Sequence, residues 1–408
     1  MPSLFSTPVF YCLWAFLFLL RPVVRIRIGL IPYRSLGRIA GNMEYYLRKK
    51  ARGGPGPGQV DVLVSGTRPV NRQIMKMVKR RVRVLESDWL WGWLRDMQGE
   101  PPAQPGRQGR PPDTPLWLNL RHAGFLVEWE TWRQVEPQLD FTEEEHVLGR
   151  ELLRTLGIPE GAEYVTMHAR DKAYTDSPDT VRSPDDPFSY DDFRDCDIAT
   201  YLPAAEWLTE QGIWVVRVGH RVEGPLPGNH SMIIDYAARF RGQLEDPEFA
   251  DVYLQARCKF FVGCTAGICY LSHIFNVPIA WVNMIPLAEC GRLDHDLFIL
   301  KKYRHSRQER FLTFPEMVDR GADWSRLWHD KLQAYKEEGI EFVDSTAEEI
   351  LDLVKEMHAR LEGSWKSQPE DAGLQDKFRQ IFPPGHPMTE FPGYLGAAYA
   401  RDNRELLG

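Results

Sequence analysis

Residues 164–171 read Tyr-Val-Thr-Met-His-Ala-Arg-Asp, an apolar run typical of a strand that passes directly into His, Arg and Asp. Two later segments have a similar form. Residues 215–219 carry Arg217 within an apolar run, and residues 260–263 break into the small residues 264–267. Polar or small residues just past buried strands mark the carboxyl edge of a parallel sheet, where proteins of this kind bind ligands. The three segments therefore predict a ligand site in the second half of the chain.

Strands and helices alternate on both sides of these segments. Apolar and β-branched runs are followed several times by stretches with helical periodicity. Such alternation is typical of a parallel sheet with helices on both faces. We therefore expect an α/β fold with two Rossmann-like βαβ lobes. The expected strands are 23–30, 60–64, 82–85, 164–168, 213–218, 258–263 and 278–282, and the expected helices are 43–50, 71–81, 142–156, 198–211, 247–257, one from Thr265 onward, and 346–361, with a turn-rich loop at 32–42.

Length and linker composition predict the domain boundaries. The chain has 408 residues, enough for two domains with separate cores. Gly and Pro are concentrated at 53–58 and 99–115, which indicates a linker and a long flexible loop. We expect four parts: an apolar segment at 1–21, a first lobe at 22–140, a second lobe at 141–365, and a helical tail at 366–408 that packs back on the first lobe.

Charge is distributed unevenly along the chain. The net charge is −7, but residues 21–85 carry sixteen Lys or Arg against Glu44 and Asp61, so this segment stands at +14 and the remainder at −21. A basic first lobe is suited to binding an anionic surface, such as nucleic acid or a membrane leaflet. Nucleic acid is the less favoured surface, because no module of interleaved aromatic and basic residues is recognisable and the second lobe is acidic.

The apolar start of the chain favours a membrane as that surface. Residues 4–20 are almost wholly apolar, and Arg21, Arg25 and Arg27 follow them. A secretory signal places positive charge before its apolar run, whereas arginines after the run keep the next domain in the cytoplasm. We expect a membrane anchor or a helix lying on the membrane. A cleaved signal and a misassigned start are the alternatives.

A helix that begins at Thr265 would offer an anion site. Its free backbone N–H groups and its dipole favour negative charge, and the small residues Ala266 and Gly267 would let a phosphate approach the backbone. The alternative is an ordinary helix cap formed by Thr265.

The other polar strand ends would add donors to that site. Arg170 and Arg217 have the forked guanidinium that binds a diphosphate. For Arg217, a buried ion pair with Asp171 or Asp235 is the alternative. His168 is expected either to donate to a phosphate or to transfer a proton, with a structural role as the alternative.

Three further patterns are given less weight. Asp195 and Asp197 match the D-x-D spacing of a metal chelator, but Asp197 is better explained as the cap of the following helix. Asp294 and Asp296 have the same spacing in an acidic loop that we expect to be solvated. The Trp-rich segment 89–93 fits a membrane-interface belt or a core equally well.

The six cysteines include no C-x-x-C pair, so neither a zinc ribbon nor a dithiol site is indicated, and buried reduced thiols are expected.

A series of short motifs extends from about residue 25 to the end of the chain. The first lobe and the chain end contribute Gly37, Asn42-x-Glu44-x-Tyr46-Leu47 and the C-terminal segment 394–407. The second lobe contributes His168-x-Arg170-Asp171, Arg194-Asp195-x-Asp197-Ile198, Tyr201, Val216-Arg217-Val218-Gly219, Asp235-Tyr236, Tyr253-Leu254, Phe260-Phe261-Val262-Gly263 and Asn283-x-x-Pro286. With these motifs the chain resembles a bacterial family of glycosyltransferases with a GT-B-like fold.

The resemblance implies a transferase that moves a sugar from a nucleotide-diphosphate donor without a metal or other cofactor. The second lobe would bind the nucleotide-sugar donor and the first lobe the acceptor, a glycan or lipid-linked molecule at the cytoplasmic face of the bacterial inner membrane. The His-x-Arg segment, similar to one in fucosyltransferases, hints at a GDP-sugar. The implied catalytic residues are His168, Arg170, Asp171 and Arg217, the implied donor-binding residues are Gly219, Asp235, Tyr236, Thr265, Ala266, Gly267 and Asn283, and the implied acceptor-side residues are Gly37, Arg38 and Asn42.

Two departures from the family pattern affect these roles. Arg38 stands where the family has His, so an anion-binding role is implied there rather than a base, and Ala266 replaces the usual Ser at the phosphate turn.

Two other functions stay open. One is a sugar-nucleotide epimerase of the same fold, which needs no acceptor, and the other is a non-catalytic membrane-bound scaffold.

Overall fold

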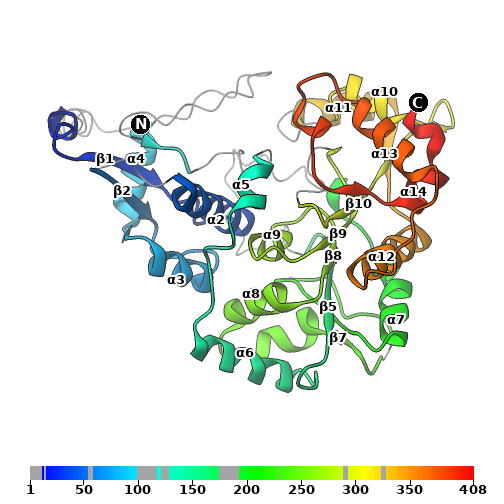
Figure 1. Ribbon diagram of the computed structural model, residues 1–408, viewed down its shortest axis with the longest axis horizontal. Helices are drawn as coiled ribbons and strands as arrows, with labels where there is room; N and C mark the ends of the chain where they lie inside the picture. The colour runs from blue at the N-terminus through cyan, green and yellow to red at the C-terminus, as the bar shows by residue number, and fades with distance from the viewer. Residues whose placement is uncertain are drawn as a thin grey trace. The chain divides into compact units, whose positions relative to one another are not determined.

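The computed structural model describes residue 12 and residues 15–53, 58–98, 117–120, 128–173, 193–228, 230–287, 293–322 and 328–408. The chain divides into two compact units, Met1–Thr142 and Glu143–Gly408 (Figure 1). Both units are mixed α/β structures with parallel sheets, so the predicted fold class is confirmed at that level. The Gly- and Pro-rich loop expected at 99–115 lies outside the described residues.

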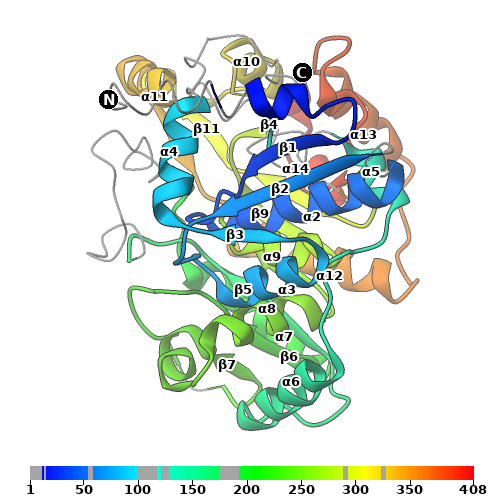
Figure 2. The same ribbon diagram turned by 90° about the vertical axis from the view of Figure 1, so that its left-hand side faces the viewer.

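The first unit contains a four-stranded parallel sheet in the order β3-β2-β1-β4. Figure 2 shows β1, β2 and β3 side by side. Arg27 on β1 lies opposite Asp61 on β2, and the two side chains form an ion pair at 2.8 Å. The strands are β1 (Arg25–Leu30), β2 (Gln59–Ser65), β3 (Val84–Glu86) and β4 (Trp117–Leu118), and the helices are α2 (Leu36–Gly53), α3 (Arg72–Arg81), α4 (Asp88–Gln98) and α5 (Trp129–Gln134).

Helix α2 corrects the expected loop at 32–42. The helix begins at Leu36, and its first two turns are buried at Gly37, Ile39 and Ala40. Packing within the first unit stabilises this part of the helix, because two glycines disfavour a helix when only local propensity is considered.

A buried ion pair holds α2 in the first unit. Arg48 donates from Nε to Glu44 at 2.6 Å, and both side chains are fully buried. Glu44 also accepts from the backbone N–H groups of Gln138 and Leu139, and Arg48 donates to the carbonyl of Trp132. Because both charges are surrounded by hydrogen-bond partners, the pair is tolerated in the core. Glu44, one of the residues that match the family pattern, therefore has a structural role.

The second unit contains a seven-stranded sheet in the order β14-β10-β9-β8-β5-β6-β7, parallel throughout. Figure 1 shows α8 and α9 on one side of this sheet and α7 and α12 on the other. The strands are β5 (Tyr164–His168), β6 (Trp214–Arg217), β7 (Ile233–Asp235), β8 (Phe261–Gly263), β9 (Ile279–Met284), β10 (Leu297–Leu300) and β14 (Tyr394–Leu395).

The helices and a small second sheet complete this unit. A capping box starts α12, where the Thr346 hydroxyl accepts from the N–H of Glu349 and the Glu349 carboxylate accepts from the N–H of Thr346. The larger helices are α6 (Glu143–Thr155), α7 (Leu202–Glu210), α8 (Pro247–Arg257), α9 (Cys269–Ile274), α10 (Phe314–Asp319), α11 (Trp328–Glu338), α12 (Ala347–Leu361), α13 (Asp371–Gln380) and α14 (Ala397–Asp402), and the second sheet is antiparallel, formed by β11 (Lys302–His305), β12 (Arg310–Phe311) and β13 (Ile340–Val343).

The C-terminal tail belongs to the second unit. Strand β14 pairs with β10 in the large sheet. Phe378 on α13 is fully buried, with its ring 5.5 Å from that of Phe298 on β10. The tail is thus an integral part of the core of the second unit.

The apolar start is described only in part. Residues 15–19 are helical, with Phe16, Phe18 and Leu19 more than half exposed. Within the described residues no helix combines the length and apolar character needed to cross a membrane. Residues 1–11, 13 and 14 of the expected apolar segment lie outside the described residues.

Candidate functional site

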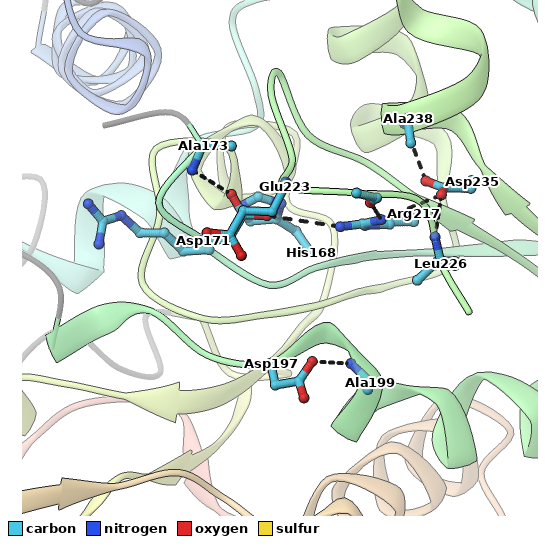
Figure 3. A network of polar contacts seen from close by, with 12 residues as sticks. His168, Asp171, Ala173, Asp197, Ala199, Arg217, Glu223, Leu226, Asp235 and Ala238 are labelled. Carbon is cyan, nitrogen blue, oxygen red and sulfur yellow. Dashed lines mark hydrogen bonds and ion pairs between the residues drawn. The ribbon is translucent and has the colours of Figure 1, made fainter. Parts of the chain in front are cut away.

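The polar segments found in the sequence meet at the carboxyl edge of the large sheet. Strand β5 lies between β8 and β6, with Met167 opposite Arg217 and His168 opposite Gly263. His168, Asp171 and Arg217 consequently gather at one place, as Figure 3 shows. This is the edge at which parallel α/β sheets bind ligands.

His168 is buried and neutral near pH 7. Its Nδ1 lies 2.9 Å from the carbonyl oxygen of Val218. Burial is the main cause that lowers the pKa of His168 to about 4, and the nearby Arg217 adds to it. A carbonyl only accepts, so Nδ1 carries the proton in the neutral ring and Nε2 has the lone pair. His168 can therefore accept a proton or hydrogen bond at Nε2, whereas the predicted donation to a phosphate does not fit this tautomer.

Arg217 lies in a buried ion-pair network. Its Nη1 donates to the carbonyl of Gly224 at 2.7 Å and to Asp235 at 3.4 Å, and its Nη2 lies 4.0 Å from Asp171 (Figure 3). The residue is only 2% exposed. These contacts match the buried ion pair with Asp171 or Asp235 that was the alternative for Arg217 in the sequence analysis. Arg217 therefore holds the loop after β6 in place.

Asp171 and Asp235 hold the loop after β6 by accepting hydrogen bonds from its backbone N–H groups. Asp171 accepts from the N–H groups of Ala173 and Glu223, each at 3.0 Å. Asp235 accepts from the N–H of Leu226 at 2.7 Å. Both carboxylates thus accept from backbone donors beside Arg217, which gives each of them a structural role.

Arg170 lies just past β5 and is tied to a second loop. Its Nη1 donates to Asp195 at 2.6 Å, and the residue is 9% exposed. Lys301 donates to the backbone carbonyl of Asp195 at 2.7 Å and pairs with Asp344. Because a guanidinium carries five N–H donors, an ion pair with Asp195 and a contact with a phosphate oxygen are compatible at Arg170.

The expected anion site at Thr265 is wrong in its details. Helix α9 begins at Cys269, four residues after Thr265. The Thr265 hydroxyl donates to the carbonyl of Ile285 at 3.1 Å and is buried. The Ala266 carbonyl accepts from the N–H of Cys269 in the intervening turn, and Gly267 is exposed in the same turn. These residues form a partly buried turn before a short helix, rather than the start of a long helix whose first turn faces a ligand.

The remaining donor-side residues have mostly structural contacts. The Tyr236 hydroxyl donates to Asp251 at 2.8 Å and is fully buried. Asn283 has φ +54°, and its side-chain oxygen accepts from the N–H of Ser345 at 2.6 Å. Gly219 packs against His168, so that a Cβ there would lie 3.4 Å from Nδ1. Gly219 therefore lies at the strand-end site, while Tyr236 and Asn283 have structural contacts in the interior.

The acceptor-side residues lie on helix α2 of the first unit. Gly37 is buried and Arg38 is exposed in its first turn. Asn42 is buried, and its Nδ2 donates to the carbonyl of Leu120 at 2.7 Å. Asn42 thus holds the segment after β4, and Arg38 is the residue of the three that presents charge at the surface.

The two D-x-D patterns have structural roles. Asp197 accepts from the N–H of Ala199 at 2.8 Å and caps the next helix, as predicted. The expectation that the other acidic loop is solvated is wrong for Asp296. That residue is fully buried and accepts from the N–H groups of Ile279 and Leu293. No group of three or more His, Cys, Asp or Glu within the described ranges could hold a metal ion.

The strand-end cluster holds more carboxylates than arginines and is not positive. Two arginines, Arg170 and Arg217, are accompanied by three carboxylates, Asp171, Asp195 and Asp235. The two predicted guanidinium donors therefore lie in a network in which each is already oriented by a carboxylate. Such a network can hold hydrogen-bond donors in fixed positions for a ligand. Because the carboxylates offset the charge of the arginines, it attracts an anion less strongly than the arginines alone would.

A cavity of about 310 Å³ lies beside β7, at the edge of the same sheet. Trp214, Leu226, Ile233 and Phe240 contribute apolar walls, and Asp235 contributes a polar group. The cavity touches the strand-end cluster through Asp235.

Sequence reasoning missed the support around Arg170. Asp195 and Lys301 hold this residue and its loop, although neither contact was predicted from the sequence. The Arg194-Asp195 segment could have pointed to this support, because it is part of the family pattern. Lys301 could not, because it follows strand β10, which was not expected.

Comparisons with solved structures find glycosyltransferases and a sugar-nucleotide enzyme. The glycosyl transferase family 9 protein of Veillonella parvula is 10% identical, with 64% of this chain and 80% of its own covered and a TM-score of 0.37. The ADP-heptose lipopolysaccharide heptosyltransferase II of E. coli is 14% identical, with 62% and 84% covered and a TM-score of 0.35. A protein described as a UDP-N-acetylglucosamine 2-epimerase from Listeria monocytogenes is 9% identical, with 85% and 99% covered and a TM-score of 0.29.

A scan against protein-family models and a search of curated proteins found no match to the chain.

Proposed function

We propose that this chain is a glycosyltransferase of GT-B-like architecture that takes its sugar from a nucleotide-diphosphate donor. The observation that carries the proposal is the polar cluster contributed by β5 and β6 at the carboxyl edge of a parallel sheet. A donor would bind there in the second unit, and the first unit would receive the acceptor, a glycan or a lipid-linked molecule.

The contacts of each residue refine its proposed role. Arg170 contacts the diphosphate and stabilises the charge that builds up as it leaves. Arg217 is a positioning residue, because its donors hold Asp235 and the carbonyl of Gly224. His168 orients a sugar hydroxyl through Nε2.

Donor binding is tested by thermal shift with GDP-, UDP-, CMP- and TDP-sugars, together with ADP-heptose. A ligand at about one hundred times its Kd stabilises the protein by about 2.7 kcal/mol, so a binding nucleotide raises the Tm. Arg170→Ala is expected to weaken binding about tenfold or more, the usual cost of removing a charged hydrogen bond. Arg257→Ala, on the exposed surface of α8, is the matched control and leaves binding unchanged.

Turnover separates the proposal from its alternatives. A glycosyltransferase releases nucleoside diphosphate in proportion to glycosylated acceptor. An epimerase converts the sugar nucleotide without an acceptor and without that release. Absence of binding by every nucleotide in the panel would leave the scaffold function and refute the proposal. Activity that persists in EDTA supports transfer without a metal, whereas its loss and recovery with a divalent ion contradict it.

We also propose that the first unit binds the cytoplasmic face of a membrane. Phe16, Phe18 and Leu19 are exposed beside Arg21, and Trp89 on α4 is 75% exposed. Aromatic and aliphatic side chains next to arginine are typical of an interfacial segment. Sedimentation with vesicles that contain anionic lipid tests this. Co-sedimentation that falls with Phe16→Ser/Phe18→Ser supports the proposal, and equal recovery in the supernatant with and without vesicles contradicts it.

A further inference from the structure

The carboxyl edge of the first sheet carries a polar cluster of its own. Strands β1, β2 and β3 are parallel and lie side by side, so the segments that follow them begin at the same edge (Figure 2). Tyr33 and Arg34 follow β1, Thr67 follows β2, and Asp88 follows β3 in the first turn of α4. None of these four residues is among those that the family pattern implies for the acceptor side. The edge is nevertheless one at which parallel α/β sheets bind ligands.

Tyr33 is the fixed centre of this cluster. The residue is 2% exposed, and its ring lies against the backbone at Gly66, where a Cβ would be 2.1 Å from Cζ of the ring. The ring also meets that of Trp91 edge to face at 5.1 Å between centroids, and the Tyr33 carbonyl accepts from the N–H of Val70 at 2.8 Å. The hydroxyl of Tyr33 therefore has a defined position at the strand ends.

Three donors orient the carboxylate of Asp88. Its Oδ1 accepts from the Tyr33 hydroxyl at 3.3 Å and from the N–H of Thr67 at 3.2 Å, and its Oδ2 accepts from the Thr67 hydroxyl. The hydrogen bonds from Thr67 are the main cause that lowers the pKa of Asp88, so the exposed side chain is ionised near pH 7 and only accepts. A carboxylate has about four acceptor sites, so these contacts leave one on Oδ2 for a ligand.

Arg34 is held beside this carboxylate. Its Nε donates to the Tyr33 hydroxyl at 3.0 Å, and its Cζ lies 5.3 Å from the centroid of the Tyr33 ring and 5.8 Å from that of Trp91. The residue is exposed, and among the residues that the structure describes neither Nη group has a hydrogen-bond partner. The guanidinium is thus fixed through Nε and its ring contacts, while both Nη groups can donate to a ligand.

The two charged groups together favour a ligand with neighbouring hydroxyl groups. A hydroxyl both donates and accepts, so one hydroxyl of a sugar can donate to Asp88 while the next accepts from Arg34. A phosphate would bring its negative charge next to the carboxylate, which offsets the attraction of the guanidinium. The cluster therefore suits a neutral sugar better than a phosphate.

We propose that Arg34 and Asp88 bind two neighbouring hydroxyl groups of a sugar at the carboxyl edge of the first sheet. Tyr33 and Thr67 are positioning residues, because they hold the two charged groups through the contacts described above. That this sugar belongs to the acceptor rests on the proposed function, while sugar binding by the first unit does not.

Saturation-transfer NMR of the full chain tests the site with methyl glycosides of hexoses, heptoses and N-acetylhexosamines, which lack the nucleotide of a donor. At least one is expected to bind the wild type. Asp88→Asn and Arg34→Ala are each expected to raise its Kd about tenfold or more, as for loss of a hydrogen bond to a charged group. Both side chains are exposed, so the variants are expected to fold, which the melting curve checks. The matched controls, Asp96→Asn on the exposed surface of α4 and Arg83→Ala just before β3, keep the wild-type Kd.

Deoxy analogues of the bound glycoside locate the contact. Loss of the hydroxyl that donates to Asp88 is expected to weaken binding to the wild type about tenfold, because the site is built to pair with that group. The same analogue and its parent are expected to bind Asp88→Asn with similar Kd values, since the contact is already lost there. If every deoxy analogue loses as much affinity for Asp88→Asn as for the wild type, Asp88 does not contact the sugar and the inference is wrong.

The other outcomes that overturn the inference are equally definite. One is a panel in which no glycoside binds the wild type, and another is binding that Asp88→Asn and Arg34→Ala leave unchanged. Binding that is lost in Arg170→Ala and kept in Asp88→Asn would assign the sugar to the second unit instead. Failure of every sugar nucleotide to bind refutes the proposed function, but leaves sugar binding at Arg34 and Asp88 standing.

Discussion

At the residue scale, Arg170 and Arg217 show how the same side chain acquires different roles. Arg217 is surrounded by the carboxylates of Asp171 and Asp235 and by a backbone carbonyl, and is nearly inaccessible. Arg170 is held by Asp195 at the end of the neighbouring strand. Removing one partner of a buried pair costs about 3–5 kcal/mol, since the other charge is left buried. These contacts agree with the proposed roles, in which Arg170 contacts the ligand and Arg217 is a positioning residue.

His168 gives a prediction on pH. Its pKa is lowered to about 4 in the folded protein from about 6.5 in the unfolded chain. The unfolded state thus binds more protons, so the free energy of unfolding falls as pH decreases below 6.5 and through 4. Between pH 7 and pH 5 this amounts to about 2 kcal/mol.

The matched variant is His168→Asn, whose amide can still donate to the Val218 carbonyl. Urea unfolding at pH 7 and pH 5 is expected to show a smaller loss of stability in this variant than in the wild type, by about 2 kcal/mol. Equal losses in the two proteins would mean that His168 is protonated in the folded state at pH 5.

At the element scale, one close contact sets the packing of α6 on α8. Gly149 on α6 faces the ring of Tyr253 on α8, and a Cβ at this position would lie 1.9 Å from Cζ. His146, on the same helix, contacts the edge of that ring at 6.2 Å between centroids. The glycine is therefore required by the neighbouring helix, even though glycine weakens a helix by about 1 kcal/mol relative to alanine.

Gly149→Ala is predicted to destabilise the second unit by about 1–3 kcal/mol, because Tyr253 is buried and must move. Gly373→Ala on α13 is the control, since nothing lies within 4 Å of a Cβ there. This control is expected to gain about 0.5–1 kcal/mol from helix propensity. Chemical denaturation measures both, and stabilisation by both substitutions would contradict the close contact.

At the scale of the whole molecule, the chain end completes the core of the second unit. Strand β14 forms one edge of the seven-stranded sheet. The Phe378 ring meets those of Phe298, Phe314 and Phe382 at centroid distances of 5.5 to 5.7 Å. A tail that adds a strand and several aromatic rings to the core is part of the folding unit rather than an appendage.

Phe378→Ala is accordingly predicted to lower the stability of the second unit by about 3–5 kcal/mol through the cavity it leaves. Hydrogen exchange resolved by peptide is the measurement. Faster exchange is expected in β9, β10 and α12, while peptides of Met1–Thr142 keep their rates. Faster exchange confined to the first unit would instead agree with the packing expected from the sequence.

Local sequence signals predicted the elements that carry strong patterns of their own. Residues 164–168 and 247–257 were expected as a strand and a helix and have these bounds in β5 and α8. β7 and β14 were not expected, because strands of two or three residues have too little pattern to read. The start of α2 was missed, because Gly37 and Gly41 signal a loop locally and only burial in the first unit makes them helical.

The sequence by itself determined the alternating α/β organisation and the positions of His168, Arg170, Asp171 and Arg217 at strand ends, because these follow from the order of apolar and polar residues along the chain. Only the tertiary structure decided which partners these side chains have. Asp195, Asp235 and Val218 come to them from separate loops and strands. Pairing between distant segments depends on packing of the whole unit, and no local pattern specifies it. The protonation of His168 and the division of roles between two arginines are therefore properties of the fold.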